Sequence, residues 1–173
     1  MKNDQVILVN EDNTPRGIME KMEAHQKAEL HRAFSIFIFN SKKQLLLQKR
    51  ASGKYHSAGL WTNTCCSHPR PNEDTQAAAE RRLKEELGID ISLMEIGNFT
   101  YIAHFDNGLT EHEFDHVFVA EYTKTPEHFN RDEISEIKWI KARDLEVVLK
   151  NQPQEFTPWL AQVLKCCLEY FSK

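Results

Sequence analysis

The sequence of 173 residues has few of the features that mark membrane, disulfide-rich or modular proteins. It has only six glycines and six prolines, with no internal repeat, low-complexity tract or linker, and no apolar run long enough to span a membrane. Its four cysteines form two adjacent pairs, a spacing that offers no disulfide framework. We therefore expect one domain over residues 1–173, working in a reducing cytoplasmic compartment.

An excess of positive charge is also missing. The formal net charge is -4 and the isoelectric point is near 6.1, which argues against general affinity for nucleic acid. The first five residues lack the apolar core of a secretion signal. We expect a small-molecule partner, with neither nucleic acid nor membrane bound, and the basic residues discussed below to form a local anion site.

The sequence does contain a thiol next to an imidazole, in the stretch Thr-Asn-Thr-Cys-Cys-Ser-His-Pro at 62–69. In a strand, residues two apart share a face, so Cys66 and His68 are predicted to point together while Cys65 points away. A thiol beside a cation or metal has its pKa lowered below the usual ~8.5, which suits Cys66 to act as a base or nucleophile. The alternative is a pair of buried core cysteines.

A second pattern, Glu111-His112-Glu113, lies at the start of a predicted strand. Alternation along this strand places Glu111 and Glu113 on one face and His112 on the other, so two carboxylates point in the same direction. Taken alone, a Glu-x-Glu pattern more often faces solvent.

Histidines complete a candidate metal site. His25 and His31 are six residues apart, too far around a helix to share a face, so a break in the chain between them is needed if both are to bind one ion. A lone surface histidine carries no such role. Three imidazoles and two carboxylates together suit Zn²⁺ or Mn²⁺, and this set consists of His25, His31, His68, Glu111 and Glu113.

Residues 73–87 are predicted to form a helix, with a capping residue and an acid at its start and Gly88 at its end. Arg82 and Glu86 are four residues apart on one face, so a cation and a metal-binding carboxylate can reach the same pocket. The alternative is an ordinary ion pair on a solvated surface.

This helix and its flanks resemble the Nudix box: Gly, five residues, Glu, seven residues, Arg-Glu-hydrophobic, one residue, Glu-Glu, one residue, Gly-hydrophobic. Ser67 replaces the opening Gly and Arg82 replaces the first Glu of the Arg-Glu pair. With the stretches 61–69 and 111–113, these departures closely resemble the type I isopentenyl-diphosphate isomerases, Nudix-fold enzymes that do not hydrolyse their diphosphate. The resemblance covers most of the chain, and the positions that match the box are Glu73, Arg81, Leu83, Glu85, Glu86, Gly88 and Ile89.

The resemblance implies an α/β (α+β) fold in which a mixed sheet is sandwiched between helices. It also implies an isomerase that interconverts isopentenyl and dimethylallyl diphosphate by a 1,3-allylic proton shift. Cys66 and Glu113 would be the acid/base groups on opposite faces of the alkene, and Tyr101 would assist Glu113.

The same resemblance assigns the binding residues. Glu86 would hold a Mg²⁺ ion with the diphosphate, and one Zn²⁺, Mn²⁺ or Mg²⁺ ion would occupy the site of His25, His31, His68, Glu111 and Glu113. The diphosphate would be bound by Lys21, Arg50, Lys54 and Arg82. Trp159 would close over the hydrocarbon end of the substrate.

Two further expectations follow from the chemistry. The faces of Trp61 and Trp159 are candidates to stabilise a tertiary carbocation by a cation-π interaction of ~2 kcal/mol when desolvated. Because water traps a carbocation, the N-terminal segment of about residues 1–30, which carries Lys21 and His25, is predicted to close over the site. A helix over about 155–173 would complete the domain.

Three other functions compete with this one. A Nudix diphosphohydrolase would leave Cys66 and the histidines without a task, and a guanidinium at position 82 would repel a hydrolytic metal ion while gripping phosphate. A non-catalytic metal protein would prefer a closed cysteine or histidine shell. A cysteine hydrolase would need an oxyanion hole and a third orienting group, for which the sequence gives no signal.

The apolar patterns predict the order of the elements. Strands are expected at 5–9, 33–39, 45–49, 61–65, 93–104, 113–122 and 136–141, and helices near 73–87, 143–150 and 157–171. The turn at 40–44 is predicted to close a hairpin, with Arg50 and Lys54 following its second strand at a mouth where an anion could bind.

Overall fold

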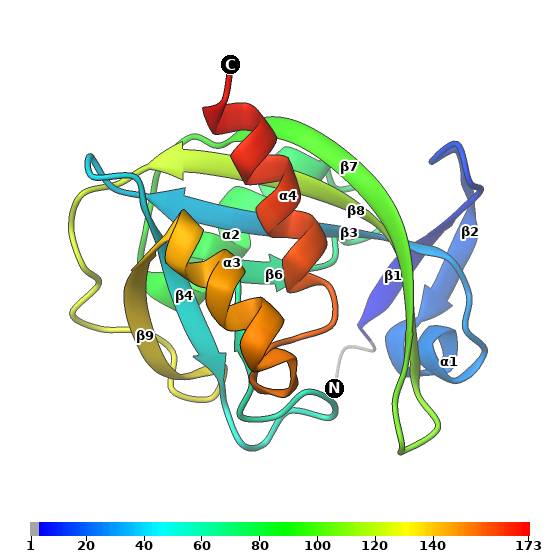
Figure 1. The fold of residues 1–173 in the computed structure, drawn as a ribbon. Helices are drawn as coiled ribbons and strands as arrows, with labels where there is room; N and C mark the ends of the chain where they lie inside the picture. The colour runs from blue at the N-terminus through cyan, green and yellow to red at the C-terminus, as the bar shows by residue number, and fades with distance from the viewer. Residues whose placement is uncertain (1–3) are drawn as a thin grey trace.

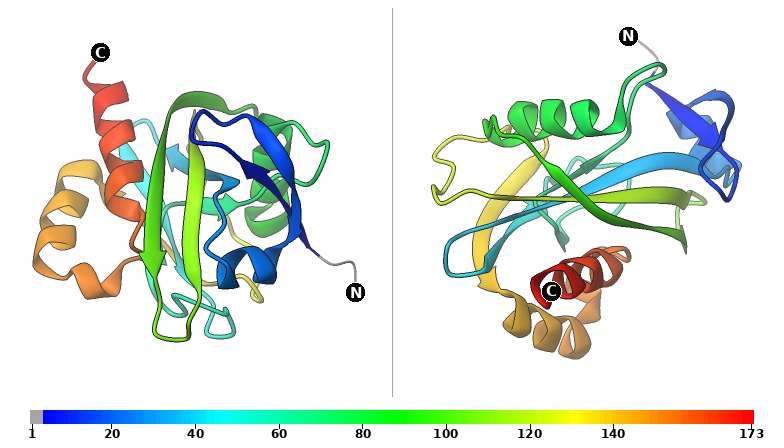
Figure 2. Two further views of the ribbon diagram at one scale, coloured as in Figure 1. Left: turned by 90° about the vertical axis from the view of Figure 1, so that its right-hand side faces the viewer. Right: turned by 90° about the horizontal axis from the view of Figure 1, so that it is seen from above.

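A computed structural model of the chain describes residues 4–173. Its strands join into one sheet of nine strands, and helices cover both faces of that sheet (Figures 1 and 2), as the resemblance implied. The strands are β1 (Gln5–Val9), β2 (Pro15–Glu20), β3 (His31–Phe39), β4 (Gln44–Arg50), β5 (Trp61–Thr62), β6 (Cys65–Ser67), β7 (Met94–His104), β8 (Thr110–Glu121) and β9 (Ile134–Lys141). The helices are α1 (Lys21–Gln26), α2 (Thr75–Leu87), α3 (Ala142–Asn151), α4 (Leu160–Phe171) and a short 3-10 turn (Pro153–Glu155).

Strand β3 lies at the centre of the sheet. It pairs in parallel with β8, from His31 opposite Glu113 to Phe39 opposite Glu121, and antiparallel with β6. Helices cover both faces of β3, so both sets of alternating side chains are buried, which explains why residues 33–39 are apolar apart from Ser35. This pairing sets the start of β3 beside the acidic start of β8.

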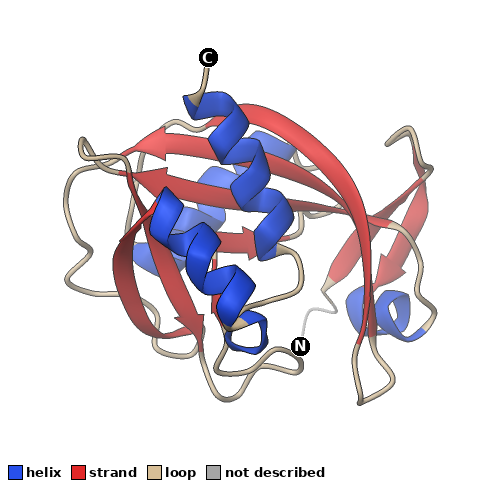
Figure 3. Ribbon diagram, viewed as in Figure 1, coloured by secondary structure: helices blue, strands red, loops and turns tan. Residues whose placement is uncertain are grey.

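Two hydrophobic cores lie on opposite faces of the sheet (Figure 3). On one face, Phe34 and Ile36 of β3 pack with Leu83 of α2. On the other face, Phe37 and Phe39 of the same strand belong to the core that includes residues of α3 and α4. Side chains that alternate along β3 therefore pack against α2 on one face of the sheet and against α3 and α4 on the other.

Helix α2 begins two residues later than predicted. The capping side chain is that of Asp74, which accepts a hydrogen bond from the backbone N–H of Ala77 at 3.0 Å. The helix ends at Gly88, whose φ of 68° lies in the left-handed region that favours glycine. Its apolar stripe, formed by Ala79, Leu83 and Leu87, is buried.

Several predicted boundaries were wrong. Strand β2 and helix α1 were not predicted, because each has only six residues, too few for a clear periodic pattern. The expected strand 61–65 is broken into β5 and β6, and the last helix starts at 160 because the 3-10 turn precedes it. No helix between residues 4 and 173 has the length and apolar character needed to cross a membrane.

The predicted N-terminal segment contains the β1–β2 hairpin and α1, while its first three residues lie outside the described part of the chain. It has a small core of its own, which includes Val6, Leu8 and Ala24. The ladder that joins it to the central sheet is short, with Leu8 opposite His31. The segment thus lies beside the main sheet and packs largely on itself (Figure 1).

Candidate active site

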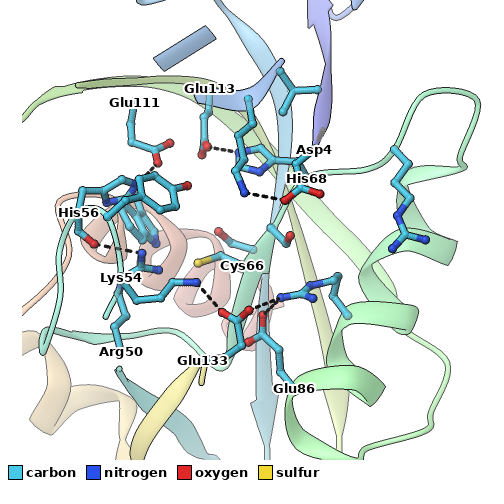
Figure 4. A pocket seen from close by; sticks show the side chains of 18 of the residues that line it. Asp4, Arg50, Lys54, His56, Cys66, His68, Glu86, Glu111, Glu113 and Glu133 are labelled. Atoms are coloured by element: carbon cyan, nitrogen blue, oxygen red, sulfur yellow. Dashed lines mark hydrogen bonds and ion pairs between the residues drawn. The ribbon is translucent and has the colours of Figure 1, made fainter. Parts of the chain in front are cut away.

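A cavity of about 370 Å³ lies between the N-terminal segment, the central strands and α2 (Figure 4). It collects side chains from segments far apart in the sequence, and most of them are polar. Its lining includes nearly all of the predicted catalytic and diphosphate-binding residues, namely Lys21, Arg50, Lys54, Cys66, His68, Arg82, Glu86, Tyr101, Glu111, Glu113 and Trp159.

The five predicted metal ligands meet at one end of this cavity. Each of His25, His31, His68, Glu111 and Glu113 offers one ligand atom, and these atoms all lie within 4.8 Å of one another. The required break in the chain is present: α1 ends after Gln26, and Ala28 takes a left-handed φ of 54° before β3 starts at His31.

The hydrogen bonds of the histidines fit a metal ion at this position. Nδ1 of His25 lies 2.6 Å from the carbonyl oxygen of Lys21, and Nδ1 of His31 lies 2.8 Å from that of Glu29. A carbonyl only accepts, so both Nδ1 atoms carry the proton and donate, which leaves Nε2 with its lone pair free in the neutral ring.

These free nitrogens face carboxylate oxygens. Nε2 of His25 is 3.2 Å from Oε1 of Glu111, and Nε2 of His31 is 3.4 Å from Oε1 of Glu113 and forms no hydrogen bond. Two acceptors that face each other need a cation between them. The site is therefore compatible with a divalent metal ion, which would meet this need for all five side chains together.

Burial shapes the charge of this cluster. It lowers the pKa of His68 to about 3, so that ring is neutral and able to bind a metal. Burial, with the charge of the neighbouring Glu111, raises the pKa of Glu113. The hydroxyl of Tyr101 donates to Oε2 of Glu113 at 2.6 Å, which places a second proton carrier on the same carboxyl group.

The two cysteines of β6 point to opposite sides of the sheet. Cys65 is fully buried in the core beneath α2, whereas Cys66 lines the cavity together with His68. Burial raises the pKa of the Cys66 thiol, and the guanidinium of Arg50 opposes this effect. Figure 4 shows Cys66 between the Glu111, Glu113 and His68 side chains on one side and Lys54, Glu86 and Glu133 on the other.

Cations gather at that second side. Arg82 donates to Oε1 of Glu86 at 2.5 Å, and Glu86 also accepts a hydrogen bond from Gln48 at 3.1 Å. Burial raises the pKa of the Glu86 carboxyl. Nζ of Lys54 donates to Glu133 at 2.5 Å, and Arg82 lies 3.4 Å from the same carboxylate. The predicted pair of Arg82 and Glu86 thus faces the cavity.

The other two carboxylates of the Nudix-like helix do not face the cavity. The guanidinium of Arg81 donates to both oxygens of Glu73, at 2.7 and 2.9 Å, and also contacts Glu85 at 3.2 Å. Neither carboxylate is part of the cavity lining. A triad of carboxylates for hydrolytic metal ions is therefore not assembled here, and Glu86 alone of the three is turned inward.

The two tryptophans differ in position. Trp159 is 3% exposed, lines the cavity and donates from Nε1 to Asn63 at 3.1 Å. Trp61 does not line the cavity: it lies opposite Lys49 across the β4–β5 ladder, and the Nζ of Lys138 is 3.9 Å from its ring centroid. The cavity lining therefore gives no support to the expectation that Trp61 contacts the substrate.

Sequence reasoning missed several residues of the cavity, among them Tyr55, His56 and Glu133. Tyr55 and His56 follow Lys54 in the irregular loop between β4 and β5, and Glu133 precedes β9. Loops carry no periodic pattern, so closeness to Lys54 was the only available signal for the first two.

Comparison with known proteins agrees with this geometry. The family model described as NUDIX domain matches residues 29–163. A solved Deinococcus radiodurans protein has the same fold, with a TM-score of 0.78 at 21% identity, over 94% of this chain and 98% of that one. A MutT protein from Methanosarcina mazei gives a TM-score of 0.67 at 17% identity, over 83% and 96% of the two chains. The chain therefore has a Nudix domain and the fold of these proteins.

Two relatives with similar sequences identify the family within the Nudix class. Isopentenyl-diphosphate Delta-isomerase 2 of Aromatoleum aromaticum is 51% identical, over 93% of this chain and 85% of its own length. The protein of the same name from Photorhabdus laumondii is 48% identical, over 92% and 89% of the two chains. The chain belongs to the isopentenyl-diphosphate Delta-isomerase family within the Nudix superfamily.

Proposed function

We propose that this chain interconverts isopentenyl diphosphate and dimethylallyl diphosphate by moving one proton onto the five-carbon chain and removing another. The main support is the cavity itself, which holds an inward-facing thiol, a carboxyl group bonded to a tyrosine hydroxyl, and a cluster of cations. The relatives carry the name of this activity. The diphosphohydrolase alternative has no such use for Cys66.

Glu113 and Tyr101 supply the first proton in this proposal. The π electron pair of the alkene forms a new C–H bond between the donated proton and the terminal carbon. The neighbouring tertiary carbon is left with carbocation character. Burial, with the charge of Glu111, raises the pKa of the Glu113 carboxyl, which favours its protonated form, and the Tyr101 hydroxyl at 2.6 Å gives the proton a second path.

Cys66 completes the exchange. As a thiolate it takes a proton from the allylic carbon, and the electron pair of the broken C–H bond becomes the new double bond, so the reaction is redox-neutral. Burial raises the pKa of this thiol, contrary to the lowering predicted from the sequence, and the positive charge of Arg50 offsets only part of that rise. In the reverse direction the thiol donates and the carboxylate accepts.

The diphosphate is held by Lys21, Arg50, Lys54 and Arg82. Arg82 and Lys54 now contact Glu133, so the substrate would compete with that carboxylate for both cations. Glu86 would hold a Mg²⁺ ion with the diphosphate, and the metal of the His/Glu cluster would be Zn²⁺, Mn²⁺ or Mg²⁺. When bound, these ions would supply positive charge that stabilises anionic groups.

The hydrocarbon end meets aromatic side chains. The ring centroid of Trp159 lies 6.1 Å from that of Tyr101, and the guanidinium of Arg50 lies 5.7 Å from the Trp159 centroid, a position in which the ring faces positive charge. The face of Trp61 is not used, because this side chain points elsewhere.

The N-terminal segment is expected to close over the bound substrate and exclude water. Lys21 and His25 both lie on α1 of this segment, so the diphosphate and the metal would each hold it in the closed position. Hydrogen exchange over residues 18–32 should slow when a non-reactive diphosphate analogue binds. Exchange that stays equally fast with and without the analogue would remove the lid from the proposal.

The activity is tested by incubating the protein with isopentenyl diphosphate and Mg²⁺ in deuterated water. We expect deuterium in the dimethylallyl diphosphate formed and no release of phosphate, because the proton added to the alkene comes from groups that exchange with solvent. Release of phosphate without deuterium in the carbon chain would show a diphosphohydrolase instead. Elemental analysis of the purified chain would identify the native metal.

A further inference from the structure

His56 is a buried histidine of the cavity to which the mechanism above gives no task. It lies in the loop between β4 and β5 and is 5% exposed. Its Nε2 is in close contact with Oε1 of Glu111 without meeting hydrogen-bond geometry, and this buried nitrogen has no hydrogen-bond partner among the described residues. Figure 4 shows the ring next to the Glu111 carboxylate.

Aromatic neighbours fix the ring of His56. It stacks on Phe105, with centroids 4.5 Å apart and planes only 11° from parallel. Trp159 meets it edge-on, at 5.9 Å and 90°. Because rotation of the ring would break both contacts, Nε2 is held toward Glu111.

The hydrogen-bond environment of His56 differs from that of the predicted metal ligands. His25 and His31 give their Nδ1 proton to a backbone carbonyl, which leaves Nε2 free to bind a metal. Nδ1 of His56 instead lies 3.2 Å from the hydroxyl of Ser57. A hydroxyl can donate, so Nδ1 can accept and the ring proton can sit on Nε2, facing the carboxylate.

We infer that His56 is a positioning residue that donates from Nε2 to Glu111 and so orients this carboxylate for the metal ion. The inference rests on the proposed function for its catalytic consequence. Glu111 Oε1 also faces Nε2 of His25 at 3.2 Å, so a misdirected carboxylate would disturb the shared ion. Donors behind a ligating carboxylate typically change metal affinity about 10- to 100-fold.

Two variants separate the donor from the ring. His56→Phe keeps an aromatic ring to stack on Phe105 but has no N–H, whereas His56→Gln keeps an N–H donor and loses the ring. Mn²⁺ is titrated into chelator-treated protein, and free Mn²⁺ is followed by electron paramagnetic resonance. We expect His56→Phe to raise the Kd for Mn²⁺ about 10- to 100-fold, and His56→Gln to restore most of this loss.

A matched control is His104→Phe, since His104 lies at the exposed end of β7 and pairs with Thr110 away from the cavity. Its Kd should equal that of the unmodified chain. In a Glu111→Gln background, His56→Phe should cause no further loss of Mn²⁺ affinity, because His56 would act on the ion only through the Glu111 carboxylate.

Turnover gives a second measurement. For His56→Phe we expect kcat for isopentenyl diphosphate to fall while KM changes little, because the diphosphate cations are untouched. The inference would be overturned if His56→Phe bound Mn²⁺ as tightly as the unmodified chain. It would also be overturned if the Phe and Gln variants lost the same Mn²⁺ affinity. Thermal melting verifies that both variants fold. If the unmodified chain failed to isomerise the substrate while His56→Phe still weakened Mn²⁺ binding, the proposed function would fail and this inference would stand.

Discussion

Replacing Cys66 with alanine should reduce kcat for isopentenyl diphosphate by about 10⁴-fold, the upper end of what a positioned acid or base contributes. The thiol lines the cavity, and among the lining residues within 4–173 only Cys66 carries a sulfur, so the allylic proton would have no thiolate to accept it. The measurement is a single-turnover assay with deuterium incorporation into dimethylallyl diphosphate. Affinity for the diphosphate should change little, because its cations remain.

The neighbouring cysteine is the matched control. Cys65 has the same chemistry one residue away, but β6 turns it into the core beneath α2. Cys65→Ala should keep kcat and lose about 1 kcal/mol in the free energy of unfolding, as a small cavity in a core does. If Cys65→Ala were the inactive variant and Cys66→Ala the active one, the assignment of the two faces of β6 would be wrong.

The elements that the sequence predicts well are those whose residues follow a local pattern. The apolar run of β3 and the stripe Ala79, Leu83 and Leu87 of α2 each follow from a period of two or 3.6 residues, and both are buried in the structure. The alternation across Cys65 and Cys66, and across Glu111 and Glu113, likewise needs only a strand. These short-range rules were enough to predict that Cys66, His68, Arg82, Glu86, Glu111 and Glu113 share a site, whereas the other predicted residues of the cavity came from the family resemblance.

The features that the sequence does not reveal depend on packing between distant segments. Trp61 has the same local setting as a substrate-facing aromatic, and only the pairing of β5 with β4 turns it toward Lys138. His56 lies in a loop without periodicity, and its contact with Glu111 joins positions 55 residues apart in the chain. Nothing within five residues of His56 could signal that contact.

The acidic side of the reaction offers the second large effect. Glu113→Gln preserves the shape of the side chain but removes both its negative charge and its acidic proton. Oε1 of Glu113 lies 2.7 Å from Nε2 of His68 and 3.4 Å from that of His31, and Oε2 accepts from Tyr101. Proton donation and metal binding therefore depend on one carboxyl group, and we expect kcat to fall about 10⁴-fold together with a large loss of Mn²⁺ affinity.

Glu111→Gln separates these two contributions. Glu111 shares the metal cluster, but its closest approach to the Tyr101 hydroxyl is 3.3 Å, against 2.6 Å for Glu113. At saturating Mn²⁺ the Glu111 variant should regain part of its turnover, because its acid is intact, while the Glu113 variant should stay inactive. If added metal restored turnover to Glu113→Gln, the proton added to the alkene would come from another group. Tyr101, whose hydroxyl is within hydrogen-bond distance of residue 113, would be the residue to examine next.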